Sequence, residues 1–576
     1  MNLAALDWVI IAAYLVLTLA IGLGLTRRAS EHVDDFFLAG RKLPWWMVGT
    51  SMVATTLAAD TPLGVTELVR TGGVAGAWYG WSAAVGIVTV AIFFSRLWRR
   101  SGVVTDAELV ELRYDGRPAS ALRVMRSVYL SLVVNTLTLG WVILAMVRIV
   151  EEVMGLPQLI ILPILLIIAV GYSTASGFWG VVATDALQFG VAMTGTIALA
   201  VFAVMDAGGP SGLTAALGER GALDLVPSAD SELLPPLTFG VYVGMQWWAT
   251  RNADGGEYLG QRVLAAKDPR HAQLGMLWYA VGEFVIKLWP IILVAASSLV
   301  LYPHLDDPQS AYPKVIAEHL PIGLRGLLVA ALLAAFMSTV DTQLNWASSY
   351  LVNDLYRRFY RPNASMKHYV RLSRVAMIAL ALFGTAVSLV LSSVADAWKL
   401  LVALGAGQGL VVLLRWYWWR INAWSEITAM IASAVTTLIV HVAWPGDEHY
   451  GARLATIAGV STVCWVAATF ATRPVALSHL CHFYARVRPD GGAWGPVQRA
   501  LGIVVRPRRV RSIVSWLLGL GFVYGLTFGV GAVILHDALY GALALAAGVL
   551  CGVALWFQLA ATYEDEDLAA EEVPSA

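Results

Sequence analysis

The chain consists largely of apolar runs of about 20 residues that follow one another from end to end. A helix of that length crosses the hydrocarbon core of a bilayer, where only helices and closed barrels satisfy their own backbone polar groups. Hydrophobic residues make up 58% of the chain and charged residues only 14%, against about 25% charged residues in soluble domains. The sequence therefore predicts an all-α polytopic membrane protein.

Fifteen runs meet this description and predict about 15 transmembrane spans. In chain order they lie near 5–26, 44–69, 75–97, 122–150, 157–173, 178–206, 237–260, 272–302, 324–353, 369–392, 395–416, 424–444, 453–472, 512–535 and 538–561. The predicted organisation is an N-terminal extra helix within 1–30, five-span blocks at 44–206 and 237–416, two further helices within 417–472, a basic connection at 473–511, a two-helix extension at 512–561 and an acidic tail at 562–576.

The basic residues predict the orientation. If the N-terminus lies outside, thirty of the 39 lysine and arginine residues fall in connections on the inner side. Cytoplasmic loops carry such an excess, so we expect a cell-membrane protein with its N-terminus outside and its C-terminus in the cytoplasm. The connection 473–511 holds eight arginines, and both solvated charge and binding to anionic lipid are compatible with it.

Two spans are interrupted, one at the start of each five-span block. The first interruption contains Asp60, Thr61, Pro62 and Gly64, where Pro62 lacks an amide donor and disfavours helical geometry at Thr61. The second, residues 247–257, places a glycine pair and three charged residues at membrane depth. Because each block has five spans, the second must run inverted, and paired interruptions of this kind indicate a midplane transport site. Ordinary proline and glycine kinks are the alternative.

The ninth predicted span carries polar side chains at membrane depth: Ser338, Thr339, Asp341, Thr342, Asn345, Ser348 and Ser349. Each such group costs a few kcal/mol in hydrocarbon unless it is paired or faces a wet cavity. Ser338 and Thr342 share a helix face with Asp341 beside them, so several oxygens converge in a way that suits a hard cation. Close packing through small residues is the alternative, but it does not explain Asp341.

Four stretches resemble signatures of the sodium:solute symporter family. They are DDFFLAGRKLPWWMVGTS at 34–51, ATDALQ at 183–188, QRVLAAK at 261–267 and AAFMST at 334–339. The resemblance covers about residues 5–445. It implies the LeuT-type fold of five-plus-five inverted repeats, related to amino-acid/polyamine/organocation-like transporters, with extra N- and C-terminal helices. It also implies import of a solute coupled to inward sodium movement by alternating access.

The resemblance further implies a sodium site between the second and ninth spans. Its ligands would be backbone carbonyls and hydroxyls of Ala54, Leu57, Ala335, Ser338 and Thr339. This is physically reasonable because a broken helix frees carbonyls that hydrocarbon cannot satisfy. Since the ligands come from different repeats, sodium would favour the conformation in which they converge.

Some members of the family have a second sodium site on the sixth and ninth spans. The matching residues here are Asp185, Ser338, Asp341 and Thr342, with a carboxylate at Asp341 where serine is expected. Two carboxylates near one ion would strengthen cation binding, or one could stay protonated in the empty site. We therefore expect either a second sodium or a proton there. A buried Asp bonded to local backbone is the alternative.

The solute is expected between the two broken helices and the third, eighth and eleventh spans. Candidate contacts are Asp60, Thr61, Gln246, Trp247, Trp248, Arg251, Asn252 and Asp254. Asp60 and Arg251 could bracket a zwitterion or a carboxylate, or pair with each other as a gate. For the two tryptophans, packing is an equally good interpretation. Gly80 and Ala83 stand where sugar-binding relatives carry Glu and Ser, which argues against a hexose.

Composition limits the other classes of function. Zero net charge gives no nucleic-acid footprint, and three scattered cysteines form neither a disulfide framework nor a zinc motif. No nucleophile–base pair or metal-ligand set occurs at membrane depth, so we do not expect an enzyme. The expected partners are a small-molecule solute, sodium (Na+) and the lipid bilayer. The alternatives are a membrane sensor module with a symporter-like domain and a proton-coupled symporter.

Overall fold

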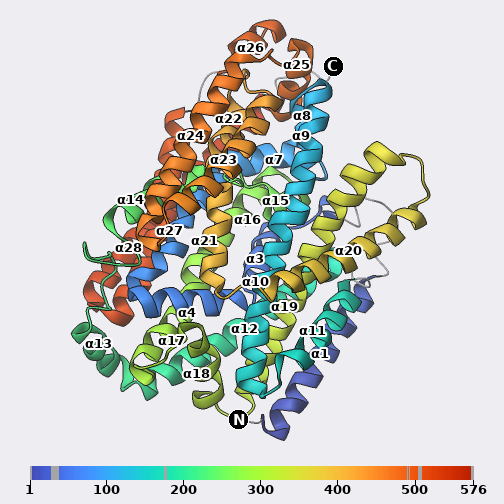
Figure 1. The fold of residues 1–576 in the computed structure, drawn as a ribbon. Helices are drawn as coiled ribbons and strands as arrows, with labels where there is room; N and C mark the ends of the chain where they lie inside the picture. The colour runs from blue at the N-terminus through green and yellow to red at the C-terminus, as the bar shows by residue number, and fades with distance from the viewer. Residues whose placement is uncertain are drawn as a thin grey trace.

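The structure, a computed structural model, describes residues 3–26, 38–173, 178–489, 491, 493–503 and 509–571. These residues form helices joined by short connections, and no β-strand occurs among them (Figure 1). Two isolated bridges pair Leu43 with Ala266 and Trp418 with Ala493. The predicted all-α class is confirmed for the described part of the chain.

The helices fall into a first half, residues 5–219, and a second half, residues 236–571. The first are α1 (Ala5–Thr26), η1 (Ala39–Arg41), α3 (Trp45–Thr56), α4 (Asp60–Gly72), η2 (Val74–Ala77), α5 (Trp78–Trp81), α6 (Ala83–Thr89), η3 (Val90–Phe94), α7 (Ser95–Ser101), α8 (Asp106–Arg113), α9 (Gly116–Val128), η4 (Tyr129–Val134), α10 (Asn135–Met154), α11 (Gln158–Ser173), α12 (Phe178–Asp206) and α13 (Gly209–Glu219). The second are α14 (Pro236–Ala249), α15 (Glu257–Ala265), α16 (Pro269–Val281), η5 (Gly282–Lys287), α17 (Leu288–Leu301), η6 (Pro308–Ser310), α18 (Ala311–His319), α19 (Leu324–Ser349), η7 (Tyr350–Tyr360), α20 (Met366–Ser388), α21 (Val394–Gly405), α22 (Gly409–Tyr417), α23 (Ala423–Ala443), η8 (Asp447–His449), α24 (Tyr450–Ala471), α25 (Leu477–Val487), α26 (Gly495–Leu501), α27 (Arg509–Leu535) and α28 (Ala538–Glu571).

Ten helical stretches of the described chain are long and apolar enough to cross a membrane, or eleven if the bent pair α21–α22 is one span. With this pair included, they correspond to the predicted spans from the third onward, without the fifth and the seventh. The first and fifth predicted spans are α1 and α11, whose described apolar parts are shorter. The second and seventh are each divided into two short helices, α3–α4 and α14–α15. The total of 15 stays a prediction.

The first interruption lies earlier than the sequence pattern predicts. The chain leaves helical geometry at Leu57 and resumes a helix at Asp60, so Thr61 and Pro62 lie inside the first turn of α4. The expectation that Thr61 is pushed out of helical geometry is wrong. Proline is tolerated in the first turn of a helix, where its missing amide would have no partner anyway.

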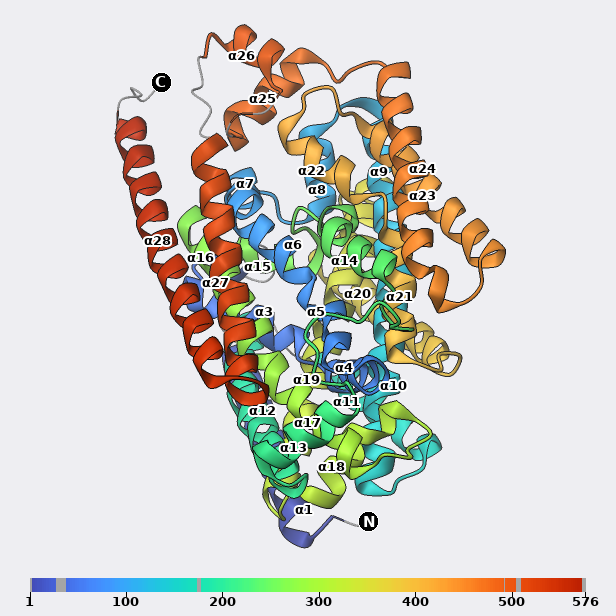
Figure 2. The ribbon, with the colours of Figure 1, turned by 90° about the vertical axis from the view of Figure 1, so that its left-hand side faces the viewer.

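α19 occupies the centre of the helix bundle, and almost all of its span is buried. By contrast, α20 and α28 leave most of their surface exposed. The N-terminus lies with α13 and α18 at the lower end of Figure 1, and α25 and α26 cover the upper end. Figure 2 shows the hairpins α27–α28 and α23–α24 at opposite edges of the bundle. Longer continuous helices therefore form these two edges of the bundle.

Four of the long helices contain a π-helical segment among the described residues: η3, η4, η5 and η7. Such segments are rare and occur mostly at functional positions. η5 carries Glu283 and Lys287, and η7 continues α19.

Candidate functional site

The break between α3 and α4 presents backbone oxygens to α19. The Leu57 N–H donates hydrogen bonds to the carbonyl oxygens of Val53 and Ala54, with N···O distances of 2.9 and 3.1 Å. Within the described chain, no backbone N–H donates to the carbonyl of Leu57. A carbonyl left open in this way at membrane depth needs another partner, such as a bound cation.

The five predicted sodium ligands belong to α3, to the residue that follows it and to α19, and these two helices contact each other. All five, Ala54, Leu57, Ala335, Ser338 and Thr339, are at most 5% exposed. The Thr339 hydroxyl donates to the Thr55 carbonyl at 3.3 Å and so bridges the two helices directly. Hydroxyl and carbonyl oxygens are the ligands that hard cations take, and a donating hydroxyl keeps its lone pairs for a metal ion.

The second predicted cation position contains an arginine. Asp185 is fully buried and accepts hydrogen bonds from Ser51 at 2.6 Å and from Ser338 at 2.7 Å. The guanidinium of Arg262 lies 4.0 Å from the same carboxylate, and it donates to Thr55 at 2.8 Å and to Thr342 at 3.3 Å. Arg262 thus already supplies a positive charge at this position.

Asp341 belongs to the same buried cluster. Its carboxylate accepts a hydrogen bond from the Asn345 side chain at 2.5 Å, and its charge acts on Arg262. Asp185, Asp341 and Thr342 therefore surround one guanidinium, which connects α12, α15 and α19.

A cavity of about 220 Å³ lies beside this region. The two breaks, α10, α19 and α21 all contribute to its lining. The lining residues are Thr55, Thr56, Ala58, Asp60, Thr138, Trp141, Val142, Arg251, Asn252, Tyr258, Thr339, Gln343, Trp398 and Leu401. We call it the central cavity. Three predicted solute contacts, Asp60, Arg251 and Asn252, line it.

The two charged residues of the central cavity differ in their pairing. Arg251 is bound by Glu257 through two contacts, Nε to Oε1 at 2.8 Å and a terminal nitrogen to Oε2 at 2.9 Å. Asp60 takes part in none of the ion pairs found among the described residues. Asp60 and Arg251 therefore face the same cavity without pairing with each other.

Lys287 and Glu283 form the i,i+4 ion pair that their spacing suggests, on η5. The Lys287 ammonium also donates to the carbonyl of Thr56 at 3.0 Å, and Glu283 accepts from the Thr56 hydroxyl at 2.7 Å. This pair therefore satisfies the last carbonyl of α3, next to the break.

The remaining predicted solute contacts do not line the central cavity. Gln246, Trp247 and Trp248 lie on α14 before the break; Trp247 packs against Trp516, with 5.9 Å between ring centroids, and Trp248 donates to the Gly244 carbonyl. Thr61 donates to the Thr56 carbonyl at 2.8 Å.

Asp254 is also directed away from the central cavity. It accepts hydrogen bonds from Arg415 at 2.6 Å and from the Trp416 indole at 2.7 Å, and it is 1% exposed. Its position makes it part of a buried ion pair that joins the second break to α22.

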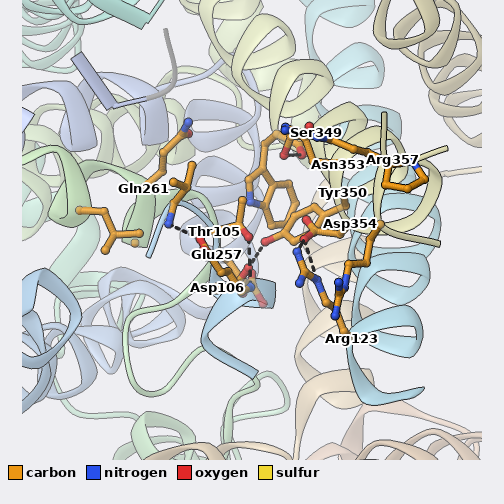
Figure 3. Close-up of a pocket in the computed structure, with 17 residues that line it drawn as sticks. Thr105, Asp106, Arg123, Glu257, Gln261, Ser349, Tyr350, Asn353, Asp354 and Arg357 are labelled. Carbon is orange, nitrogen blue, oxygen red and sulfur yellow. Dashed lines mark hydrogen bonds and ion pairs between the residues drawn. The ribbon is translucent and has the colours of Figure 1, made fainter. Parts of the chain in front are cut away.

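A second pocket, of about 370 Å³, which we call the upper pocket, is lined by residues on the far side of Glu257 from the central cavity. α8, α9, α15 and η7 form its sides (Figure 3). Tyr350 points at Asp106, and Arg123 pairs with Asp354. Glu257 lines this upper pocket while its partner Arg251 lines the central cavity. The Arg251–Glu257 pair consequently lies between the two spaces.

Several residues of the site were not among the predicted ones: Trp141, Glu257, Tyr258, Arg262, Gln343 and Trp398. Glu257 and Arg262 follow the second break closely, so the charges in that stretch were the available signal. Trp141 and Trp398 carry no such signal among 23 tryptophans.

The chain is similar in sequence to known membrane transporters. The family model described as "Sodium:solute symporter family" matches residues 36–433. A sodium/glucose cotransporter from Vibrio parahaemolyticus is 26% identical over 470 residues, covering 75% of this chain and 84% of that protein. A sodium/mannose cotransporter from Bos taurus is 28% identical over 502 residues, covering 80% and 78%.

Among solved structures, a Na+-coupled sialic acid symporter in a substrate-bound, outward-open state is similar to the chain. It aligns with a TM-score of 0.66 and 19% identity, over 82% of this chain and 99% of the symporter. At this identity the likeness shows that the two share a fold.

Proposed function

Because the chain belongs to the sodium:solute symporter family, we propose that it imports a small polar organic solute together with sodium. The observation that carries this proposal is the shared boundary of the sodium ligands and the central cavity. Thr339, a proposed sodium ligand, also lines the cavity and binds the Thr55 carbonyl. An ion that draws α3 and α19 together therefore changes the shape of the solute site, and this differential affinity is what coupling requires.

The proposed architecture is five-plus-five inverted repeats over 44–206 and 237–416, within about 15 spans. The two broken helices head the two repeats, as the family fold requires. The excess of Lys and Arg in the connections at the upper end supports a cytoplasmic upper end, with the N-terminus outside.

Alternating access needs a barrier on each side of the central cavity. On the proposed cytoplasmic side, we assign that barrier to the Arg251–Glu257 pair. It lies between the central cavity and the upper pocket, with side-chain exposures of 11% for Arg251 and 2% for Glu257. Glu257 has φ of +66°, a left-handed conformation that a residue with a side chain rarely adopts. Such strained positions are found at gates and switches.

A sodium titration tests the proposal without knowledge of the solute. Purified protein in detergent is titrated with NaCl against KCl at constant ionic strength, with tryptophan fluorescence as the readout. We expect a saturable, sodium-selective change, and Ser338→Ala should raise the half-saturating sodium concentration about tenfold, equivalent to ~1.4 kcal/mol.

Ser131→Ala is the matched control. Ser131 is also fully buried, and its hydroxyl donates to the carbonyl of Ser127 one turn earlier in the chain. It should keep the normal sodium response. A folded protein with no sodium selectivity would contradict sodium coupling and favour proton coupling instead.

We also propose that the position at Asp185 and Asp341 takes part in cation coupling, as a second sodium or a proton site. Arg262 is the competing positive charge there. Asp185→Asn and Asp341→Asn should change the sodium Hill coefficient or the pH dependence of uptake. If both stay unchanged, the cluster is structural.

A further inference from the structure

We propose that the solute carries a cationic nitrogen, recognised by the Asp60 carboxylate among the rings of Trp141, Trp398 and Tyr258. This inference rests on the proposed function, since it names the chemical class of the solute that occupies the central cavity. It differs from the hexoses in the names of the similar transporters, which have no charge.

The Asp60 carboxylate lies in the first turn of α4 and lines the central cavity. The positive end of the helix dipole at this position favours the ionised form. Among the described residues Asp60 has no ion-pair partner, and its hydrogen-bond donors include the side chains of Trp141 and Trp398. It is therefore a buried carboxyl group whose side-chain hydrogen-bond donors are neutral.

Two cations, Lys287 and Arg251, could neutralise Asp60, but each has a carboxylate partner of its own. Lys287 is the cation that acts most strongly on Asp60, but its ammonium is held by Glu283 and by the Thr56 carbonyl. Arg251 lines the same cavity, but Glu257 binds its guanidinium through two contacts. Each of these cations is matched by its own carboxylate. Arg251, Lys287 and their two partner carboxylates sum to zero, so the charge of Asp60 is left over beside the cavity, and a solute with a cationic nitrogen would balance it.

Three aromatic residues line the cavity together with Asp60: Trp141, Trp398 and Tyr258. An ammonium group is attracted to the faces of such rings as well as to a carboxylate. The Trp398 ring packs directly onto Gly64, where an added Cβ would come within 2.5 Å of the ring. This contact fixes the tryptophan beside the turn that carries Asp60.

The other lining residues and the volume of the cavity indicate the polarity and the size of the solute. Asn252, Gln343 and Thr138 offer neutral donors and acceptors. The volume of 220 Å³ is below the roughly 300–1,000 Å³ of pockets for drug-sized ligands. A small, hydroxylated or amide-bearing molecule with one cationic nitrogen fits both properties.

Matched pairs of compounds test the inference. The pairs are glucosamine with glucose, serinol with glycerol, and choline with its uncharged carbon isostere dimethylbutanol. Full-length protein in detergent is saturated with sodium, and the shift of its thermal unfolding is measured against the concentration of each compound. We expect the cationic member to bind at least tenfold more tightly than its neutral partner in at least one pair.

Variants at Asp60 connect that preference to the carboxylate. Asp60→Asn should abolish the tenfold preference, and Asp60→Glu should retain part of it. A single cooperative thermal unfolding transition in Asp60→Asn, measured without any compound, would show that the variant is folded. A preference that is unchanged in Asp60→Asn would overturn the inference.

The outcomes separate this inference from the proposed function. Neutral members that bind as well as the cationic ones overturn the cationic class and leave sodium-coupled transport standing. A sodium-responsive protein that none of the cationic members stabilises also overturns the cationic class. Loss of the sodium response itself, in folded wild-type protein, contradicts the proposed function.

Discussion

The α3–α4 break and the α14–α15 break both reach the central cavity, but their polar groups have different partners. At the first break, the Leu57 carbonyl accepts no backbone hydrogen bond from the described chain, and Asp60 has no ion-pair partner there. At the second break, Arg251 pairs with Glu257, and Asp254 pairs with Arg415.

This difference separates two roles that the sequence presents as symmetrical. Unmatched oxygens at the first break are available to a cation and a solute, because a ligand can supply the missing partner. Matched charges at the second break hold the chain in one arrangement, and a ligand would have to displace them. We therefore propose that the first break is the binding half of the site and that the second break is its barrier.

The largest effect should come from Asp254→Ala at the second break. It leaves the fully buried Arg415 with Glu426 as its remaining partner, and loss of one member of a buried ion pair costs about 3–5 kcal/mol. We expect a large fall of the unfolding temperature in detergent. Asp60→Asn is the matched control at the first break and should change stability little. Equal losses in the two variants would show that the breaks do not differ.

The next effect should come from Glu257→Gln, which leaves Arg251 without its countercharge. The loss of hydrogen bonds to a charged group costs about 1.5–3 kcal/mol. Because the pair is the proposed barrier, solute accumulated in proteoliposomes should leak out faster. The double variant Arg251→Gln with Glu257→Gln should be less destabilised than the sum of the singles. Normal retention of solute in Glu257→Gln would remove the barrier role.

A smaller effect is expected from Gly64→Ala at the first break. Its Cβ would lie 2.5 Å from the Trp398 ring, and the ring must move into the cavity to relieve the overlap. We expect solute affinity to fall about tenfold, or ~1.4 kcal/mol, with an unchanged sodium response. The measurement is solute-induced stabilisation at saturating sodium. Weakened sodium binding in this variant would mean that the two ligands share more than Thr339.

The smallest effect should follow from Trp248→Phe on α14. Trp248 is outside the lining of the central cavity and donates to the Gly244 carbonyl of its own helix. We expect a stability change within about 0.5 kcal/mol and unchanged solute affinity in the same binding assay. A clear loss of affinity would extend the binding half of the site to the second break.

The sequence predicts a part of each break. Small polar residues of α19 are unusual enough at membrane depth to mark the sodium region, and the family resemblance adds Ala54 and Leu57. The exact break at Leu57–Ala59 escapes the pattern, because proline is compatible with the first turn of α4. Charges at the second break were evident, but not their partners. Asp254 pairs with Arg415, which lies 161 residues later in the chain. The local spacing of residues cannot predict a contact over such a separation.

The same reason explains the missed residues. Arg262 reaches Asp185 only because α12, α15 and α19 converge, and Trp398 reaches the cavity only because Gly64 leaves room for its ring. Both depend on tertiary packing rather than on spacing.

The π-helical segment η5 has a mechanical consequence. A π-helical turn holds one residue more than an α-helical turn needs, so a return of η5 to α geometry would rotate one side of the helix by about 100° relative to the other. Such a rotation would carry the Lys287 ammonium away from the Thr56 carbonyl while the backbone ladder on both sides stayed intact. Such a change would be a single discrete step, because its size is the rotation per residue of an α-helix and not a variable bend.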